Sequence, residues 1–283
     1  MSHTEKKILN AGQSPFGWHR IQKFMHCPTK YYYSYVAKEP RGSASSGLIR
    51  GSLLHTGLAH HYAIMKSKQN NEDHNLHEPM SAMMIQADEE GESWNEEIEH
   101  CVEVLAEYMH DKQVKEWERN WEILHVEDVF AMNIEEYELT FRADLVARNR
   151  TDKRVYIIDH KTSGQIRTDT TKGYESSGQV IGFHVLGEKI WGNEFGGLII
   201  NYVQHGGKRK TPKIKFERQS VTKSESHIKT FAQSVYFYRK LIEHYKDKEV
   251  KHYPRVQSEF TCMHKYGSCE YYDKCFDNHN NQQ

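Results

Sequence analysis

The stretch from Leu139 to Lys161 constrains the fold more than any other part of the sequence. Two apolar, β-rich segments, LTFRADLVARN and RVYIIDHK, flank a short polar turn over residues 150–153, which is the pattern of a β-hairpin. Asp144 lies inside the first segment, and Asp159 and Lys161 end the second. Side chains alternate between the faces of a strand, so Asp159 and Lys161 share a face, and antiparallel pairing can bring Asp144 onto it. Burying two carboxylates and an ammonium costs too much without a partner, and a divalent cation is the natural one.

Composition limits the classes of protein to which the chain can belong. Its 283 residues allow one large domain or two small ones, and we expect a single domain over residues 1–283. The formal net charge is −1, so any anionic partner must be held by a local basic patch. No apolar run approaches membrane-spanning length, and the start MSHTEKKILN lacks the apolar core of a signal peptide. We therefore expect an intracellular protein without a membrane partner.

Hydrophobic periodicity predicts helices on both sides of the hairpin. Helical spacing is found over residues 16–25, 50–66, 177–191 and 226–245, and twice within 80–121 with a break near Gly91. Residues 123–132 and 196–204 are strand-like. We therefore expect an α/β fold in which a central mixed sheet of about four or five strands is flanked by helices. The segment over about residues 80–121 would be a helical insertion.

Three features outside the hairpin are candidates for a site. His55 lies close to the apolar stripe of the helix over residues 50–66, and such a histidine taken alone is more often structural than a ligand. Glu127, in the strand-like segment over 123–132, is a further candidate acid. A basic run, KRKTPKIKFER, is usually a solvated edge, but beside a metal site it is a candidate for phosphate contacts. Its candidate nucleic-acid-binding residues are Lys208, Arg209, Lys210, Lys213 and Lys215.

Five motifs in order, from about Ile21 to Phe276, make the chain resemble the PD-(D/E)XK nuclease superfamily in its RecB-like branch. RIQKFMHCPTKYYYSY resembles the opening helix of that branch with its "CP" cysteine. The other four are Gly51-x-x-x-His55, Arg142-Ala143-Asp144, Asp159-His160-Lys161, and Gln179-x-x-x-Phe183 in the place of a Q-x-x-x-Y motif. The last departs from the family pattern, because Phe183 stands where the family has Tyr. The hydroxyl of that tyrosine is therefore lost or supplied elsewhere.

The resemblance implies a restriction-endonuclease-like core and a metal-dependent deoxyribonuclease. It implies Mg²⁺ or Mn²⁺, with a histidine favouring Mn²⁺, and these ligands: His55, Asp144, Asp159 and the backbone carbonyl of His160. Lys161 would orient the attacking water or stabilise the transition state, and Gln179 would hold Lys161 or the phosphate in register. The branch further implies an exonuclease acting on single strands or duplex ends, in recombination, repair or spacer acquisition. Its setting would be the cytoplasm of a prokaryotic or phage-infected cell, with recombination or CRISPR-adaptation proteins as candidate partners.

The last third of the chain carries a dense group of cysteines, spaced C-x6-C-x5-C. Five cysteines in a chain of this kind favour metal ligation over disulfides. In the RecB-like branch three C-terminal cysteines join an N-terminal one to hold a [4Fe–4S] cluster, which implies Cys27, Cys262, Cys269 and Cys275. The rival is a zinc site in which His279 replaces Cys27, with a CCCH spacing. Either metal would tie the cysteine-rich tail over residues 254–283, and we favour the cluster because zinc leaves Cys27 unexplained.

A second class of function stays open. The chain could be a non-catalytic nucleic-acid-binding protein with a CCCH-type zinc site, in which the basic run binds strands and the acids are relics. Retention of both acids, of Lys161 and of Gln179 favours the nuclease.

Overall fold

The computed structural model describes residues 6–9, 14–40, 44–166, 168–206, 213–221, 225–256, 258–264 and 267–277. The chain divides into two compact units. The first comprises residues 1–14, 45–130 and 141–228, and the second comprises residues 15–44, 131–140 and 229–283. The single domain expected over residues 1–283 stays a prediction. None of the helices in the described ranges has the length and apolar character needed to cross a membrane.

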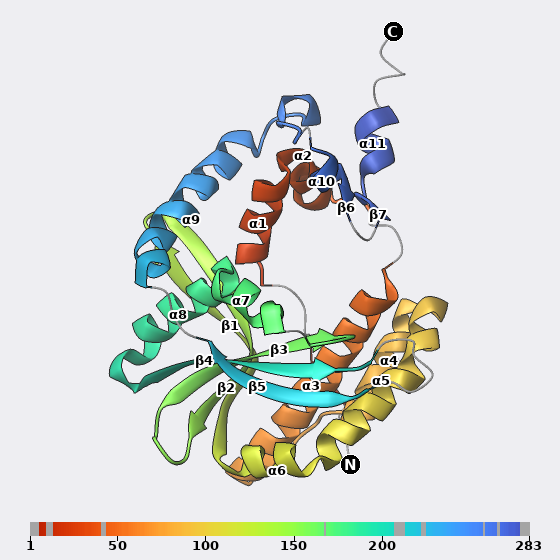
Figure 1. Ribbon diagram of the computed structural model, residues 1–283, viewed down its shortest axis with the longest axis vertical. Helices are drawn as coiled ribbons and strands as arrows, with labels where there is room; N and C mark the ends of the chain where they lie inside the picture. Colours follow the sequence, from red (N-terminus) through yellow and green to blue (C-terminus); the bar gives the residue numbers. More distant parts are fainter. Residues whose placement is uncertain are drawn as a thin grey trace. The chain divides into compact units, whose positions relative to one another are not determined.

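A five-stranded sheet, in the order β1-β2-β3-β4-β5, dominates the first unit (Figure 1). The strands are β1 (Trp121–Ile134), β2 (Tyr137–Asn149), β3 (Val155–Ser163), β4 (Phe195–Gln204) and β5 (Lys215–Val221). The facing ends of β1 and β2, residues 131–140, belong to the second unit. β3 is antiparallel to β2 and parallel to β4, and β5 is antiparallel to β4. The α/β fold with a mixed sheet flanked by helices is thereby confirmed.

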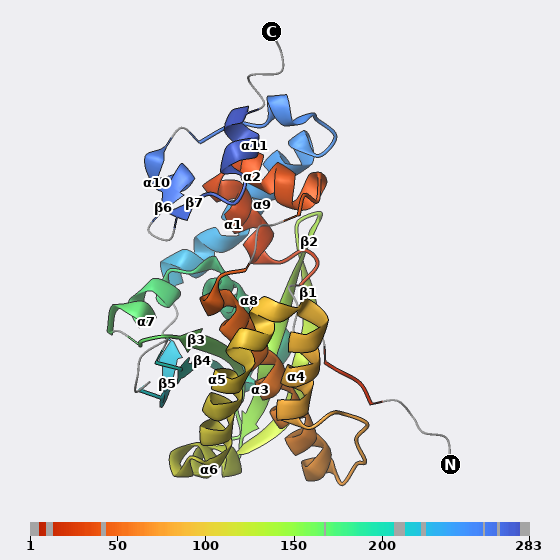
Figure 2. The same ribbon diagram turned by 90° about the vertical axis from the view of Figure 1, so that its right-hand side faces the viewer.

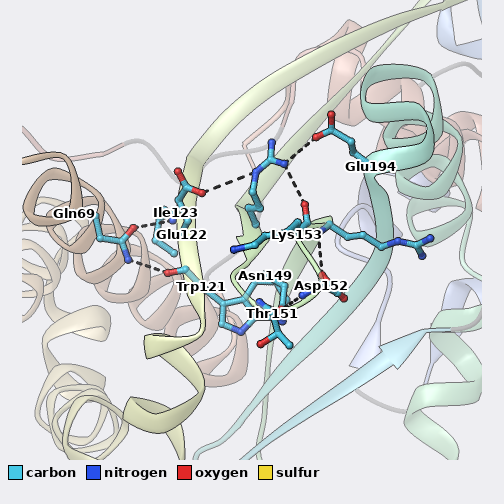
Figure 3. A network of polar contacts seen from close by, with 11 residues as sticks. Gln69, Trp121, Glu122, Ile123, Asn149, Thr151, Asp152, Lys153 and Glu194 are labelled. Carbon is cyan, nitrogen blue, oxygen red and sulfur yellow. Dashed lines mark hydrogen bonds and ion pairs between the residues drawn. The ribbon is translucent and has the colours of Figure 1, made fainter.

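The hairpin that the sequence predicts is formed by β2 and β3. Its register runs from Leu145 opposite Ile158 to Arg148 opposite Val155. Polar contacts fix the turn: the Lys153 N–H donates to the carbonyl of Asn149 at 3.0 Å, and Arg148 pairs with Glu194 at 2.9 Å (Figure 3). A one-residue slip would move every side chain of a strand to the other face, so these turn contacts also fix where the acids point.

Helices cover the sheet of the first unit. They are α3 (Ser46–Asn70), α4 (Pro79–Glu90), α5 (Glu92–His110), α6 (Lys112–Arg119), α7 (Thr168–Glu175) and α8 (Gly178–Trp191), followed by the 3-10 turn η2 (Gly192–Glu194). Figure 2 shows α3, α4 and α5 alongside one another. Gly91, with φ of +103°, separates α4 from α5 at the predicted break. The core joins these helices to the sheet through Leu53, Leu58, Leu105, Val114, Leu145, Ile158 and Ile199.

The second unit brings together segments from the two ends of the chain. It contains α1 (Trp18–His26), α2 (Pro28–Tyr31), the π-helical turn η1 (Tyr32–Val36), all but the first turn of α9 (Glu225–Tyr245), η3 (Val250–His252), α10 (Glu259–Cys262), β6 (Met263–His264), β7 (Gly267–Ser268) and α11 (Tyr272–Asp277). The Thr29 hydroxyl donates to the carbonyl of Tyr253 at 3.3 Å. The rings of Tyr33 and Tyr271 lie 5.3 Å apart. Residues more than 220 positions apart therefore share one core.

Candidate active site

The first acid lies directly beyond the paired part of β2 and β3. The register includes Leu145 and Ile158, and the next residue outward on β2 is Asp144. Its carboxylate oxygen Oδ2 accepts a hydrogen bond from the backbone N–H of His160 at 2.7 Å. A bond between a carboxylate and an N–H is stronger than a neutral one, so the two strands are joined here by a side chain. Asp144 is thereby held beside the segment that carries the second acid.

Lysine and glutamine converge on that second acid, Asp159, which is only 3 % exposed. The ammonium nitrogen Nζ of Lys161 lies 2.6 Å from Oδ2 of Asp159, and Nε2 of Gln179 donates to Oδ1 at 3.3 Å. Gln179 stands in the first turn of α8, where the Ser177 side chain accepts from its backbone N–H. Burial alone would lower the pKa of Lys161, but the carboxylates of Asp159 and Asp144 outweigh it and raise that pKa.

His55 reaches the same place from α3. Its Nδ1 lies 3.6 Å from Oδ2 of Asp144. Gly51, one turn earlier on the same face of the helix, explains the approach: a Cβ added there would lie 3.2 Å from the hydroxyl oxygen of Thr162 on β3. The Gly51-x-x-x-His55 spacing therefore allows α3 to pass close to the strand that carries Asp159.

Glu127 adds a carboxylate that the sequence marks only as a candidate acid. It lies within β1 with a φ of +54°, a left-handed conformation that is unusual for a non-glycine residue and turns its side chain inward. The Arg142 guanidinium donates to its carbonyl at 3.1 Å. Burial, and then the neighbouring Asp144 carboxylate, raise the pKa of Glu127 to about 9. Burial also raises the pKa of Asp144, although His55 partly offsets it.

The donor atoms of His55, Glu127 and Asp144 fit a divalent cation. One ligand atom from each lies within 4.8 Å of the other two. Oxygen ligands bind Mg²⁺ or Ca²⁺ at about 2.0–2.6 Å, so one ion can span donors separated by up to about 5 Å. Burial raises the pKa of both carboxyl groups, so a bound cation would stabilise their charged forms.

Other predicted residues lie elsewhere. Phe183 is 1 % exposed and packs against Phe141 with ring centroids 5.4 Å apart, so its ring belongs to the core. Lys213 is exposed, and Lys215 pairs with Glu217. Lys208, Arg209 and Lys210 lie outside the described residues.

The sequence pattern did not single out Tyr174 of α7, whose ring lies 5.5 Å from the Lys161 ammonium.

In the second unit, Cys27, Cys262, Cys269 and Cys275 line one cavity of about 480 Å³. Within the described ranges, no three cysteine sulfur atoms all lie within 4.8 Å of one another. Burial raises the pKa of Cys275, with the other three cysteines adding to the rise and Arg255 opposing it. His279 lies outside the described residues. The two ends of the chain therefore bring all four predicted cysteines to one cavity.

Comparison with known proteins identifies the family. Residues 16–276 match the model of the PD-(D/E)XK nuclease superfamily. No curated protein matches the chain. A crystal structure from Eubacterium rectale, named "Putative exonuclease", is similar to 95 % of this chain over 88 % of its own length, with a TM-score of 0.50 and 11 % identity, a likeness of fold alone. The family match extends over most of the sequence, and the chain belongs to the PD-(D/E)XK nuclease superfamily.

Proposed function

We propose that the protein is a metal-dependent deoxyribonuclease that hydrolyses phosphodiester bonds, acting as an exonuclease on single strands or duplex ends. One observation carries the proposal. Residues from α3, β2 and β3 converge, with the His55 ring 3.6 Å from Asp144, and the backbone of His160 joined to that same carboxylate. Lys161, two residues after Asp159, forms an ion pair with it.

Each residue would have a distinct task. His55, Asp144 and Asp159, with the carbonyl of His160, would hold Mg²⁺ or Mn²⁺, and Glu127 would add a carboxylate. When bound, such an ion lowers the pKa of water and stabilises negative charge on the scissile phosphate. Lys161 would face that charge with an ammonium preorganised by Asp159. Gln179, bonded to the other oxygen of Asp159, would prevent the carboxylate from rotating away from Lys161.

Exonuclease activity and the RecB-like branch are supported by the order of the five motifs. The name of the similar structure from Eubacterium rectale agrees with an exonuclease, although its 11 % identity supports the fold only. We place the activity in DNA recombination, repair or spacer acquisition, inside a prokaryotic or phage-infected cell. The described lysines of the basic segment, Lys213 and Lys215, would contact phosphates.

We further propose that Cys27, Cys262, Cys269 and Cys275 hold a [4Fe–4S] cluster, for which an all-cysteine set is the usual ligation. Four thiolates around one zinc ion, with Zn–S bonds of about 2.3 Å, lie roughly 3.8 Å apart. The contribution of Cys27 to the cavity favours the cluster over a zinc site that leaves Cys27 out. A brown protein containing iron and sulfide supports the cluster, whereas a colourless protein containing one zinc ion refutes it.

The nuclease is tested with purified protein on end-labelled linear DNA and on circular DNA, with Mn²⁺ or with EDTA. We expect the protein to remove the labelled ends of linear DNA in Mn²⁺ and not in EDTA, and to leave circular DNA intact. Asp159→Ala should abolish cleavage and retain DNA binding. Cleavage of circles would refute the exonuclease. Binding without cleavage by the wild-type protein would favour the non-catalytic alternative, and unchanged cleavage by Asp159→Ala would remove Asp159 from the mechanism.

A further inference from the structure

Three polar side chains lie side by side across the middle of the sheet. His160 on β3 is opposite Asn201 on β4, and Asn201 is opposite Arg218 on β5. Figure 1 shows these three strands as neighbours. His160 and Asn201 are buried, with Asn201 0 % exposed. Polar groups in such a place are usually hydrogen-bonded, because an unpaired one costs free energy.

Tyr108 of α5 hydrogen-bonds to two members of this row of polar side chains, Asn201 and Arg218. Its hydroxyl oxygen lies 2.5 Å from the hydroxyl of Tyr62, 3.0 Å from Nδ2 of Asn201 and 3.1 Å from Nη2 of Arg218. The amide and guanidinium nitrogens can only donate, so they fill both lone pairs of the Tyr108 oxygen. Tyr108 must therefore donate its own hydrogen to Tyr62. Every hydrogen-bonding capacity of this hydroxyl is used.

The row ends on the ring of His160. Nδ2 of Asn201 lies 2.8 Å from Nδ1 of His160, and its second hydrogen is available for that nitrogen. The ring of Tyr62 stacks on His160 at 5.4 Å and 13°, while His55 meets His160 edge-on at 6.2 Å. The imidazole of His160 is thus held on three sides.

Stability alone does not explain these residues. The neighbours two positions away on the same strand face are Ile158 on β3 and Val203 on β4, and both are part of the apolar core. Apolar residues therefore fit this face of the sheet. Replacing both partners of a buried hydrogen bond with apolar residues of the same shape can be neutral or stabilising, so the presence of these polar residues calls for a reason other than stability.

We propose that Tyr108, Asn201 and Tyr62 are positioning residues of the metal centre, which act through His160. Fixing that ring fixes the backbone between Asp159 and Lys161 and supports the imidazole of His55. Because the target of this arrangement is the metal centre, the proposal rests on the proposed function. None of the three residues is expected to contact DNA.

Tyr108→Phe tests the proposal by removing only the connecting hydroxyl. Three quantities should be measured: the melting temperature in EDTA, Mn²⁺ affinity by calorimetry without DNA, and kcat and KM for linear DNA. We expect Mn²⁺ affinity and kcat each to fall about tenfold. This is the lower end of the loss, about 10–100-fold, that usually follows removal of a residue that orients a metal ligand. KM should stay within about twofold of the wild-type value. Tyr62→Phe keeps the Asn201–Tyr108 contact and should weaken Mn²⁺ binding less, by about threefold.

Tyr253→Phe is the matched control. Tyr253 is a buried tyrosine of the second unit whose hydroxyl donates to the carbonyl of Tyr245 at 2.6 Å. It should lower the melting temperature and leave Mn²⁺ affinity and kcat unchanged. A lower melting temperature with unchanged Mn²⁺ affinity and kcat in Tyr108→Phe would overturn the positioning role alone. If Tyr108→Phe does not fold, unchanged Mn²⁺ affinity in Tyr62→Phe overturns it. A wild-type protein that binds no Mn²⁺ would overturn the proposed function and this proposal together.

Discussion

Glu127→Gln should make the metal-free protein more stable, and increasingly so as the pH rises. The pKa of Glu127 is raised to about 9, first by burial and then by the Asp144 carboxylate. An unfolded glutamate ionises near pH 4.3. Between these two values the unfolded chain has released the proton that the folded protein still holds. The wild type therefore loses stability with rising pH across this window, and the loss levels off above about pH 9.

The magnitude follows from proton linkage. One proton held only by the folded state changes the free energy of unfolding by up to about 1.4 kcal/mol per pH unit. Between pH 6 and 8 the difference between Glu127→Gln and wild type should grow by up to roughly 3 kcal/mol. Glu127 and Asp144 titrate as a pair. In the variant, Asp144 therefore retains part of the pH dependence of the unfolding free energy, and we expect the stability difference from wild type to grow by about 1–3 kcal/mol.

The assay is urea unfolding in EDTA at pH 6, 7 and 8. Glu122→Gln on the same strand is the control, because Glu122 is exposed and its difference from wild type should stay within about 0.5 kcal/mol. A difference between Glu127→Gln and wild type that is the same at all three pH values would refute a buried, protonated Glu127. In Mn²⁺ the wild type should become more stable than Glu127→Gln, because Mn²⁺ should stabilise the wild type more than the variant.

Three further changes test separate parts of the account. Lys161→Met should abolish cleavage and lower stability in EDTA by about 3 kcal/mol, because it leaves Asp159 buried without its cation; a loss under about 0.5 kcal/mol in urea unfolding would contradict a buried pair. Tyr174→Phe should retain kcat, whereas Tyr174→Leu should lower it several-fold by removing the ring beside Lys161; equal kcat in both variants would dismiss the contact. Cys275→Ser should lose visible absorbance and iron, whereas Cys101→Ala, which changes a buried cysteine of α5, should keep both; iron retained by Cys275→Ser would exclude that ligand.

Local patterns were sufficient to predict the elements that carry the site. The alternation around Asp144 and Asp159 gave the hairpin and its turn, since strand periodicity and turn chemistry are encoded within a few residues. Gly91 gave the break between α4 and α5 for the same reason. The gathering of the four cysteines was predicted from family motifs, because nothing local links Cys27 to the C-terminal segment.

Features that depend on tertiary contacts were not predictable in this way. The left-handed φ of Glu127 has no local sequence pattern that demands it, and only the surrounding fold turns its carboxylate toward Asp144. Tyr108 and Asn201 look like ordinary core positions until the register places Asn201 beside His160. The polar stretch that forms α7 lacks helical periodicity, so the contact of Tyr174 with Lys161 was also missed.

The most direct test of the metal centre is a crystal of the protein soaked in Mn²⁺ and measured for anomalous scattering. We predict a peak within bonding distance of His55 Nδ1 or Nε2, of a carboxylate oxygen of Asp144, and of a carboxylate oxygen of Glu127 or Asp159. A peak bound to other residues, or none at Mn²⁺ concentrations that support cleavage, would contradict a shared metal ion at the site where β2 and β3 diverge.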